Sequence, residues 1–290
     1  ACVTDPGLVH QLCAMITDYS IDMMQKHIAS MEHPGFPGRN FPSISENIGV
    51  MSVNPVVGET NDAGLNDIRK RAITKEHVLN AIASADTGAV TEGNVGAGTG
   101  TVCFGFKGGI GTSSRILPQS KGGFTVGVLV QTNFGGILQI TGVPVGLELG
   151  RHKFIKIPGE YKEDGSCMVV IMTNAPLDSR NLKRLAARAM AGIARTGGMT
   201  SNSSGDYAIA VSTAENLRIP YNPKSMYQEL KVLRNEEMDL LFEAVIEATE
   251  EAVINSLFAA TTLTGKYNFR IESLPVDKVL EIMKKYNRIH

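Results

Sequence analysis

Residues 158–173 read PGEYKEDGSCMVVIMT, and the change of character inside this stretch decides the fold. Residues 158–164 are polar and rich in turn formers, whereas residues 166–173 are almost entirely apolar. An apolar run of this length that follows a turn is typical of a strand covered on both faces. We therefore predict a buried strand with Ser166 at its mouth, directly after Gly165.

A serine that follows a glycine at this position offers a route to self-cleavage. The Ser166 hydroxyl can attack the carbonyl carbon of Gly165, because glycine lacks a Cβ and lets the backbone take the strained geometry of the attack. Water then resolves the resulting ester. The freed α-amino group of Ser166, with an ordinary pKa of about 7.7–8.0, can act as the base for its own hydroxyl. The same dipeptide is also ordinary turn chemistry, so the neighbouring residues must decide between the two interpretations.

Several blocks of sequence, in the same order, resemble the DmpA-type aminopeptidases of peptidase family S58, which are N-terminal-serine hydrolases. The blocks are EGNVGAGTG (92–100), FGFKGGIGT (104–112), VLVQTNFG (128–135), DGS (164–166), TNAPL (173–177) and SNSSGD (201–206). Blocks in register are a more specific signal than any single motif. The resemblance runs from about Glu59 to the C-terminus, and it implies a four-layer αββα sandwich, no cofactor and a homo-oligomer.

Three further polar residues are candidates for the catalytic machinery. Asn133 follows an apolar strand, and the resemblance implies that its amide helps to form the oxyanion hole, although a turn asparagine has the same pattern. Ser204 and Asp206 flank a glycine, so in extended backbone their side chains face the same way. The resemblance implies that they orient the amino group of Ser166, whereas Ser-Ser-Gly-Asp taken alone is also a common turn or cap.

Glu59 is the candidate for binding the substrate's ammonium group. It opens the segment ETNDAGLND (59–67), which is similar to a family segment with an aromatic residue at its third position. Here that position is Asn61, so a phenol hydroxyl that stabilises the oxyanion is missing, and full activity or the usual substrate range is in doubt. A solvated loop carboxylate is the alternative interpretation of Glu59.

Composition and charge exclude several classes of function. The net charge of −1 and the absence of a basic run argue against nucleic acid and anionic membranes as partners. Four cysteines and six histidines show no metal-ligand spacing, so we expect no metal and reduced thiols. The glycine-rich stretches at 96–100 and 105–108 lack the strand-turn-helix frame and the Walker spacing, which excludes nucleotide binding. With no spanning segment or signal pattern, we expect a cytoplasmic protein.

The chain reads as one domain over residues 1–290. It begins at Ala1 without methionine, so we expect that the family's N-terminal segment is missing. Apolar spacing and capping residues predict helices at 8–28, from Thr74 to 84, from Asp178 to Gly197, at 235–260 and after Pro275. Strands are expected at 101–106, 124–132 and 207–213, and a proline-rich loop at 32–54.

Taken together, these features predict a serine hydrolase that cuts itself into residues 1–165 and 166–290. It would then release N-terminal residues from small peptides, amides or esters through an acyl-enzyme on Ser166. Two alternatives remain: an acyltransferase of the ornithine acetyltransferase type, whose acyl-enzyme is intercepted by an amine, and an uncut, inactive binding or scaffold protein.

Overall fold

A computed structural model describes residues 58, 60–84, 89–152, 165–219 and 224–289 of the chain. The predicted helix at 8–28, the predicted loop at 32–54 and Glu59 lie outside these residues. The described helices include none that is long and apolar enough to cross a membrane.

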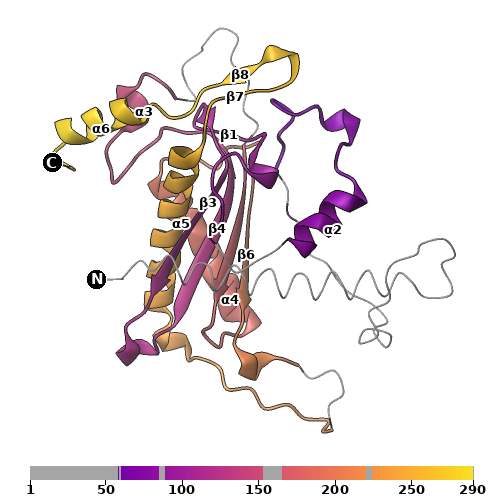
Figure 1. The fold of residues 1–290 in the computed structure, drawn as a ribbon. Coiled ribbons are helices and arrows are strands. Elements are labelled where there is room, and N and C mark those ends of the chain that lie inside the picture. Colours follow the sequence, from indigo (N-terminus) through magenta and orange to yellow (C-terminus); the bar gives the residue numbers. More distant parts are fainter. Residues whose placement is uncertain (1–57, 59, 85–88, 153–164, 220–223, 290) are drawn as a thin grey trace, which may run out of the picture.

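A four-stranded mixed sheet forms the centre of the molecule (Figure 1). Its strands, in spatial order, are β3 (Ile110–Ile116), β4 (Thr125–Asn133), β5 (Ser166–Thr173) and β6 (Gly205–Ser212). The β3–β4 and β4–β5 pairs are antiparallel, and the β5–β6 pair is parallel. Ser166, at one end of β5, lies opposite the candidate Asn133 on one side and opposite Gly205, between the candidates Ser204 and Asp206, on the other.

Two long helices cover one face of this sheet. Helix α5 (Asp239–Ala259) packs across β3 and β4, α4 (Ser179–Arg195) packs on β6, and the two helices contact each other. Helix α4 begins where the sequence predicts, because the carboxylate of Asp178 accepts a hydrogen bond from the backbone N–H of Asn181 at 2.7 Å. Helix α5 lies so close to β3 that a Cβ on Gly111 would fall 1.9 Å from the Ala252 carbonyl oxygen.

Alternation along β5 divides its side chains between the two faces of the sheet. Cys167, Val169 and Ile171 are fully buried in the core that the helices close. Ser166 and Met168 alternate with them and therefore point to the opposite face. In the described part of the chain, the four-stranded sheet thus has a helical layer on one face, which corresponds to one α and one β layer of the predicted αββα sandwich.

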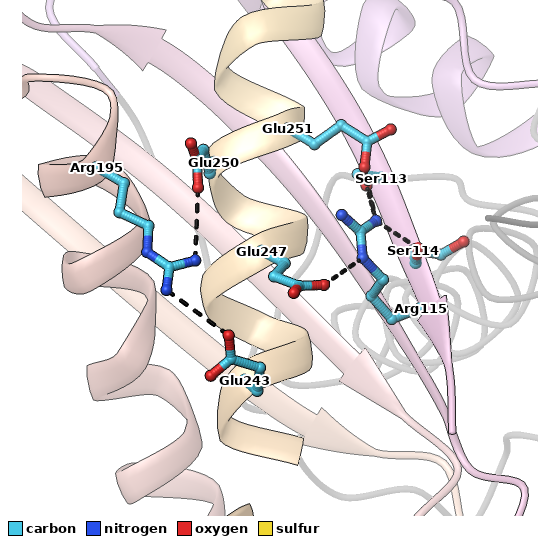
Figure 2. A network of polar contacts seen from close by, with 8 residues as sticks. All are labelled: Ser113, Ser114, Arg115, Arg195, Glu243, Glu247, Glu250 and Glu251. Carbon is cyan, nitrogen blue, oxygen red and sulfur yellow. Dashed lines mark hydrogen bonds and ion pairs between the residues drawn. The ribbon is translucent and has the colours of Figure 1, made fainter. Parts of the chain in front are cut away.

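An ion-pair network fastens α5 to its neighbours on both sides (Figure 2). Arg115 of β3 bonds Glu247 at 3.0 Å and Glu251 at 2.6 Å, and its side chain is only 11% exposed. On the other side of α5, Arg195 at the end of α4 pairs with Glu243 at 3.6 Å and is 45% exposed. Because exposed pairs contribute little, we expect the Arg115 side of the network to matter more for stability.

Smaller elements surround the sheet. They are α2 (Lys75–Ala83), β1 (Val102–Cys103), β2 (Phe106–Lys107), α3 (Val145–Glu148), β7 (Leu263–Thr264), β8 (Arg270–Ile271), α6 (Val276–Lys285) and six 3-10 turns among the described residues. The predicted strand at 101–106 is wrong as a single strand. Phe104 and Gly105 both have positive φ values, of 52° and 76°, so the chain turns back there and forms the β1–β2 hairpin.

The other predicted elements agree with the structure more closely. The helices expected from Thr74, from Asp178, at 235–260 and after Pro275 correspond to α2, α4, α5 and α6, and the strands at 124–132 and 207–213 correspond to β4 and β6. Strand β3 was not predicted. It contains Gly111 and four polar residues among its seven, so its sequence lacks the apolar alternation of a typical strand.

Candidate active site

The Gly165-Ser166 junction lies at one end of the central sheet. Gly165 is buried, and Ser166 is 8% exposed as the first residue of β5. Because β5 is an inner strand, its first residue has neighbours on both sides, Asn133 of β4 and Gly205 of β6. The sheet therefore brings Asn133 to one side of this peptide bond and the Ser204–Asp206 segment to the other.

Asn133 is held against the Ser166 hydroxyl by three hydrogen bonds of its side-chain amide. Its Nδ2 donates to Ser166 Oγ at 3.0 Å and to the backbone carbonyl of Asn61 at 2.8 Å. Its Oδ1 accepts from the backbone N–H of Val102 at 3.0 Å. With both N–H groups and the oxygen engaged, the amide has one orientation, and one N–H points at Ser166 Oγ.

Ser204 and Asp206 form a second polar pair beside the junction. Ser204 Oγ donates to Asp206 Oδ1 at 2.9 Å. Burial raises the pKa of Asp206, and the Ser204 hydrogen bond opposes that rise. Asp206 lies opposite Cys167 in the ladder, so this pair occupies the helix-covered side, whereas the Ser166 side chain occupies the other. The Ser204–Asp206 pair and the Ser166 hydroxyl with its Asn133 partner thus lie on opposite faces of the sheet.

Contacts to Gly165 complete the surroundings of that bond. The backbone N–H of Gly205 donates to the Gly165 carbonyl oxygen at 2.9 Å. A Cβ placed on Gly165 would lie 2.6 Å from Ser204 Oγ and 3.1 Å from Ser204 Cβ. A larger residue at position 165 would therefore displace Ser204. The Gly165 carbonyl, which self-cleavage would attack, already accepts a hydrogen bond from a fixed N–H, and this favours negative charge on its oxygen.

Asn61, where the resemblance implies an aromatic residue, lies at this site through its backbone. Its carbonyl accepts the hydrogen bond from Asn133, while its exposed side chain accepts from the backbone N–H of Ala63 at 2.9 Å in a local turn. The Asn61 side chain is thus used locally and supplies no hydroxyl to the site. Glu59, the predicted ammonium ligand, lies outside the described residues.

Sequence reasoning missed the backbone N–H of Val102, which orients Asn133, and the buried Lys107 nearby. Val102 follows a glycine-rich segment that showed only a failed resemblance to a nucleotide loop. A backbone donor leaves no signature in the residue type, so no signal in the sequence pointed to it. Over the described part of the chain there is no group of three or more His, Cys, Asp or Glu residues suited to a metal.

Comparison with known proteins identifies the family of the chain. The model of peptidase family S58 matches residues 18–270. The beta-peptidyl aminopeptidase BapA of Sphingosinicella microcystinivorans is 44% identical over 247 residues, which are 81% of this chain and 62% of that protein. This chain thus spans about three fifths of the length of that curated relative.

Solved structures show the same fold. A protein of Pyrococcus horikoshii is 48% identical with a TM-score of 0.75, over 84% of this chain and 66% of that one. The L-aminopeptidase D-Ala-esterase/amidase of Ochrobactrum anthropi is 33% identical with a TM-score of 0.75, over 93% of this chain and 72% of that one. The latter is described as a variant of the Ntn hydrolase fold, so the predicted fold class is confirmed.

Proposed function

Because this chain belongs to peptidase family S58, we propose that it is a self-processing serine hydrolase whose nucleophile is the N-terminal serine released at Gly165-Ser166. The single observation that carries this proposal is the hydrogen bond of 3.0 Å from Asn133 Nδ2 to Ser166 Oγ. The hydroxyl oxygen accepts that bond beside the peptide bond it would cut. A surface serine in a turn has no need of such a partner.

Self-cleavage would proceed by an acyl shift from nitrogen to oxygen. Ser166 Oγ attacks the Gly165 carbonyl carbon, the Gly165–Ser166 C–N bond breaks, and the hydroxyl proton ends on the departing nitrogen. The developing oxyanion stays in the hydrogen bond from Gly205 N–H. Water then hydrolyses the ester, which leaves a carboxylate on Gly165 and both a free hydroxyl and a free amino group on Ser166.

The cut protein would use the same residue on its substrates. The free amine of Ser166 takes the proton of its own hydroxyl as Oγ attacks the substrate carbonyl, and it returns that proton to the leaving amine or alcohol. The acyl-enzyme is then hydrolysed by water. Asn133 is the proposed oxyanion donor for the substrate. The Ser204–Asp206 pair is proposed to orient the Ser166 nitrogen, first as the leaving group of self-cleavage and then as the free amine.

The proposed substrates are small peptides, amides or esters with a free N-terminal amine, and the proposed ammonium ligand is Glu59. The curated relative is a beta-peptidyl aminopeptidase. This name supports substrates of the present chain that begin with a β-amino acid. The solved Ochrobactrum anthropi relative carries an L-aminopeptidase and D-Ala-esterase description. A panel of matched β-amino-acid amides, L-amino-acid amides and D-alanine esters separates these preferences, and the missing phenol at Asn61 predicts lower turnover than in relatives that have one.

We propose that the two pieces, residues 1–165 and 166–290, stay together in one domain after cleavage. Strand β4 precedes the bond and β5 follows it, and they pair along eight residue positions from Val126 to Asn133. The proposal also includes a homo-oligomer in the cytoplasm. Large apolar side chains exposed between β6 and α5, such as Met226 at 89% and Tyr227 at 80%, support association with another copy.

The first experiment is the intact mass of the purified protein under denaturing conditions, beside the Ser166→Ala variant. Two fragments from the wild type, one beginning at Ser166, and none from the variant are the expected result. A single full-length mass of 31.1 kDa from both would overturn self-processing and favour the scaffold alternative. Cleavage followed by transfer of the acyl group to an added amine rather than to water would identify the acyltransferase alternative.

A further inference from the structure

Lys107 is a fully buried lysine close to the proposed nucleophile. Its side chain, at the end of β2, has an exposed fraction of 0%. Its ammonium group donates to three backbone carbonyls, those of Gly98 at 2.8 Å, Thr101 at 2.8 Å and Gly108 at 2.7 Å. All three of its N–H donors are therefore satisfied, which is the condition under which a buried charge is tolerated.

One of these carbonyls connects the ammonium to the site. The Thr101 carbonyl belongs to the same peptide group as the N–H of Val102, which donates to Asn133 Oδ1 at 3.0 Å. The other end of the Asn133 amide donates to Ser166 Oγ. Three hydrogen bonds in series, through one peptide group and one side-chain amide, thus join the positive charge of Lys107 to the nucleophilic oxygen.

Each link in this series strengthens the next. A cation on a carbonyl oxygen withdraws electron density from its peptide group and makes the attached N–H a better donor. The Val102 N–H then polarises the Asn133 amide in the same direction, so that its Nδ2–H becomes a better donor to Ser166. Such series are strongest where water is excluded, and Lys107, Val102 and Asn133 are all buried.

We propose that Lys107 is a positioning residue for the nucleophile: its charge, acting through the Thr101–Val102 peptide group, orients and polarises the Asn133 amide toward Ser166. The inference rests on the self-cleavage proposed above. A merely structural lysine would fasten the carbonyls of Gly98, Thr101 and Gly108 and affect folding alone. The two roles differ in how the rate of self-cleavage depends on the charge.

Raising the pH removes the charge of Lys107 by deprotonating its ammonium group. Burial lowers the pKa of Lys107 to about 8, and the neighbouring Cys103 and Asp62 oppose that shift. The ammonium is thus present below pH 8 and is lost as pH rises through that value. Self-cleavage of the uncut chain is the suitable readout, because Ser166 has no free α-amino group before the cut and cannot contribute a titration in the same range.

The experiment compares self-cleavage in the wild type and in Lys107→Met, with Lys121→Met as the matched control. Lys121 is half-exposed and pairs with Glu237 far along the chain. Uncut protein from cell-free synthesis is moved to buffers from about pH 6 to about pH 10, and loss of the full-length species is followed with time. The ratio of the wild-type rate to the variant rate cancels any pH effect common to both.

We expect Lys107→Met to cut roughly 10-fold more slowly than wild type near neutral pH, since holding Ser166 Oγ less firmly should cost less than the roughly 10² that a misplacement of 1 Å can cost. The ratio should fall toward one above pH 8, whereas Lys121→Met should match wild type throughout. A ratio that does not change with pH, whether large or close to one, overturns the proposal.

A second measurement tests the proposal if Lys107→Met fails to fold or if the wild type does not cut itself. In uncut Ser166→Ala, the side-chain amide signals of Asn133 are followed by NMR over the same pH range, with Asn133→Asp used for assignment. A shift with a midpoint near pH 8 supports the link from Lys107, and signals that do not move overturn it. A wild type that does not cut overturns the proposed function instead, and this NMR result then decides the inference by itself.

Discussion

Replacing Gly165 by alanine should slow self-cleavage, because the new methyl group falls on a residue of the proposed site. The added Cβ would lie 2.6 Å from Ser204 Oγ and 3.1 Å from Ser204 Cβ. Ser204 must therefore leave the position from which it donates to Asp206 at 2.9 Å. A hydrogen bond to a charged group contributes about 1.5–3 kcal/mol. If that contribution is lost in the transition state, the rate falls by about 10- to 150-fold.

The assay is the time course of cleavage by denaturing gel and intact mass, with Gly205→Ala as the matched control on the adjacent strand. The three atoms nearest to a Cβ on Gly205 belong to the Tyr207 side chain, the closest at 3.3 Å, and Tyr207 is 62% exposed and can move. Gly205→Ala also keeps the N–H that donates to Gly165. We expect it to cut within a few-fold of wild type. Cleavage of Gly165→Ala at the wild-type rate would refute the argument that Ser204 must stay in place.

Three further predictions concern single side chains. Asn133→Asp keeps the oxygen that accepts from Val102 but loses the donor to Ser166. Turnover of substrate, for which Asn133 is the proposed oxyanion donor, should therefore fall by about 10²–10³, measured as single-turnover rates. Because burial raises the pKa of Asp206, its carboxylate takes up a proton at a higher pH than an ordinary aspartate. The rate of self-cleavage should therefore fall on acidification with a midpoint above pH 3.8, and in Asp206→Asn this decrease should be absent. Thr249 is fully buried, and among the described residues its hydroxyl has no hydrogen-bond partner, so Thr249→Val should raise the melting temperature by a few degrees, about 1 kcal/mol, without changing the cleavage rate.

Local patterns in the sequence predicted the elements that depend on neighbours in the chain. The change from a polar turn to an apolar run placed Ser166 at the start of a buried strand, where β5 begins. The capping aspartate Asp178 marked the start of α4, and apolar periodicity marked α5. These signals extend over a few residues, and the physical forces behind them do too.

The sequence alone also identified the candidate residues, and the tertiary structure determined how they meet. Asn133 and Ser166 are far apart in sequence, and only the β4–β5 register brings the amide to the hydroxyl. The parallel β5–β6 pairing likewise brings Ser204 against Gly165. Register depends on how whole strands pack, because a slip of one residue would turn every side chain to the other face, so no local pattern contains it.

The remaining features were decided by tertiary structure alone. A lysine in a glycine-rich segment gives no sign of burial, since lysines are mostly exposed, yet Lys107 is fully enclosed by carbonyls. Strand β3 is recognisable only from its partners, because Gly111 admits α5 and Arg115 pairs with glutamates of that helix. The sequence by itself thus determined the family and the candidate nucleophile, Ser166. The packing of distant segments decided the environment of that serine, because burial and hydrogen bonding are set by residues far away in the chain.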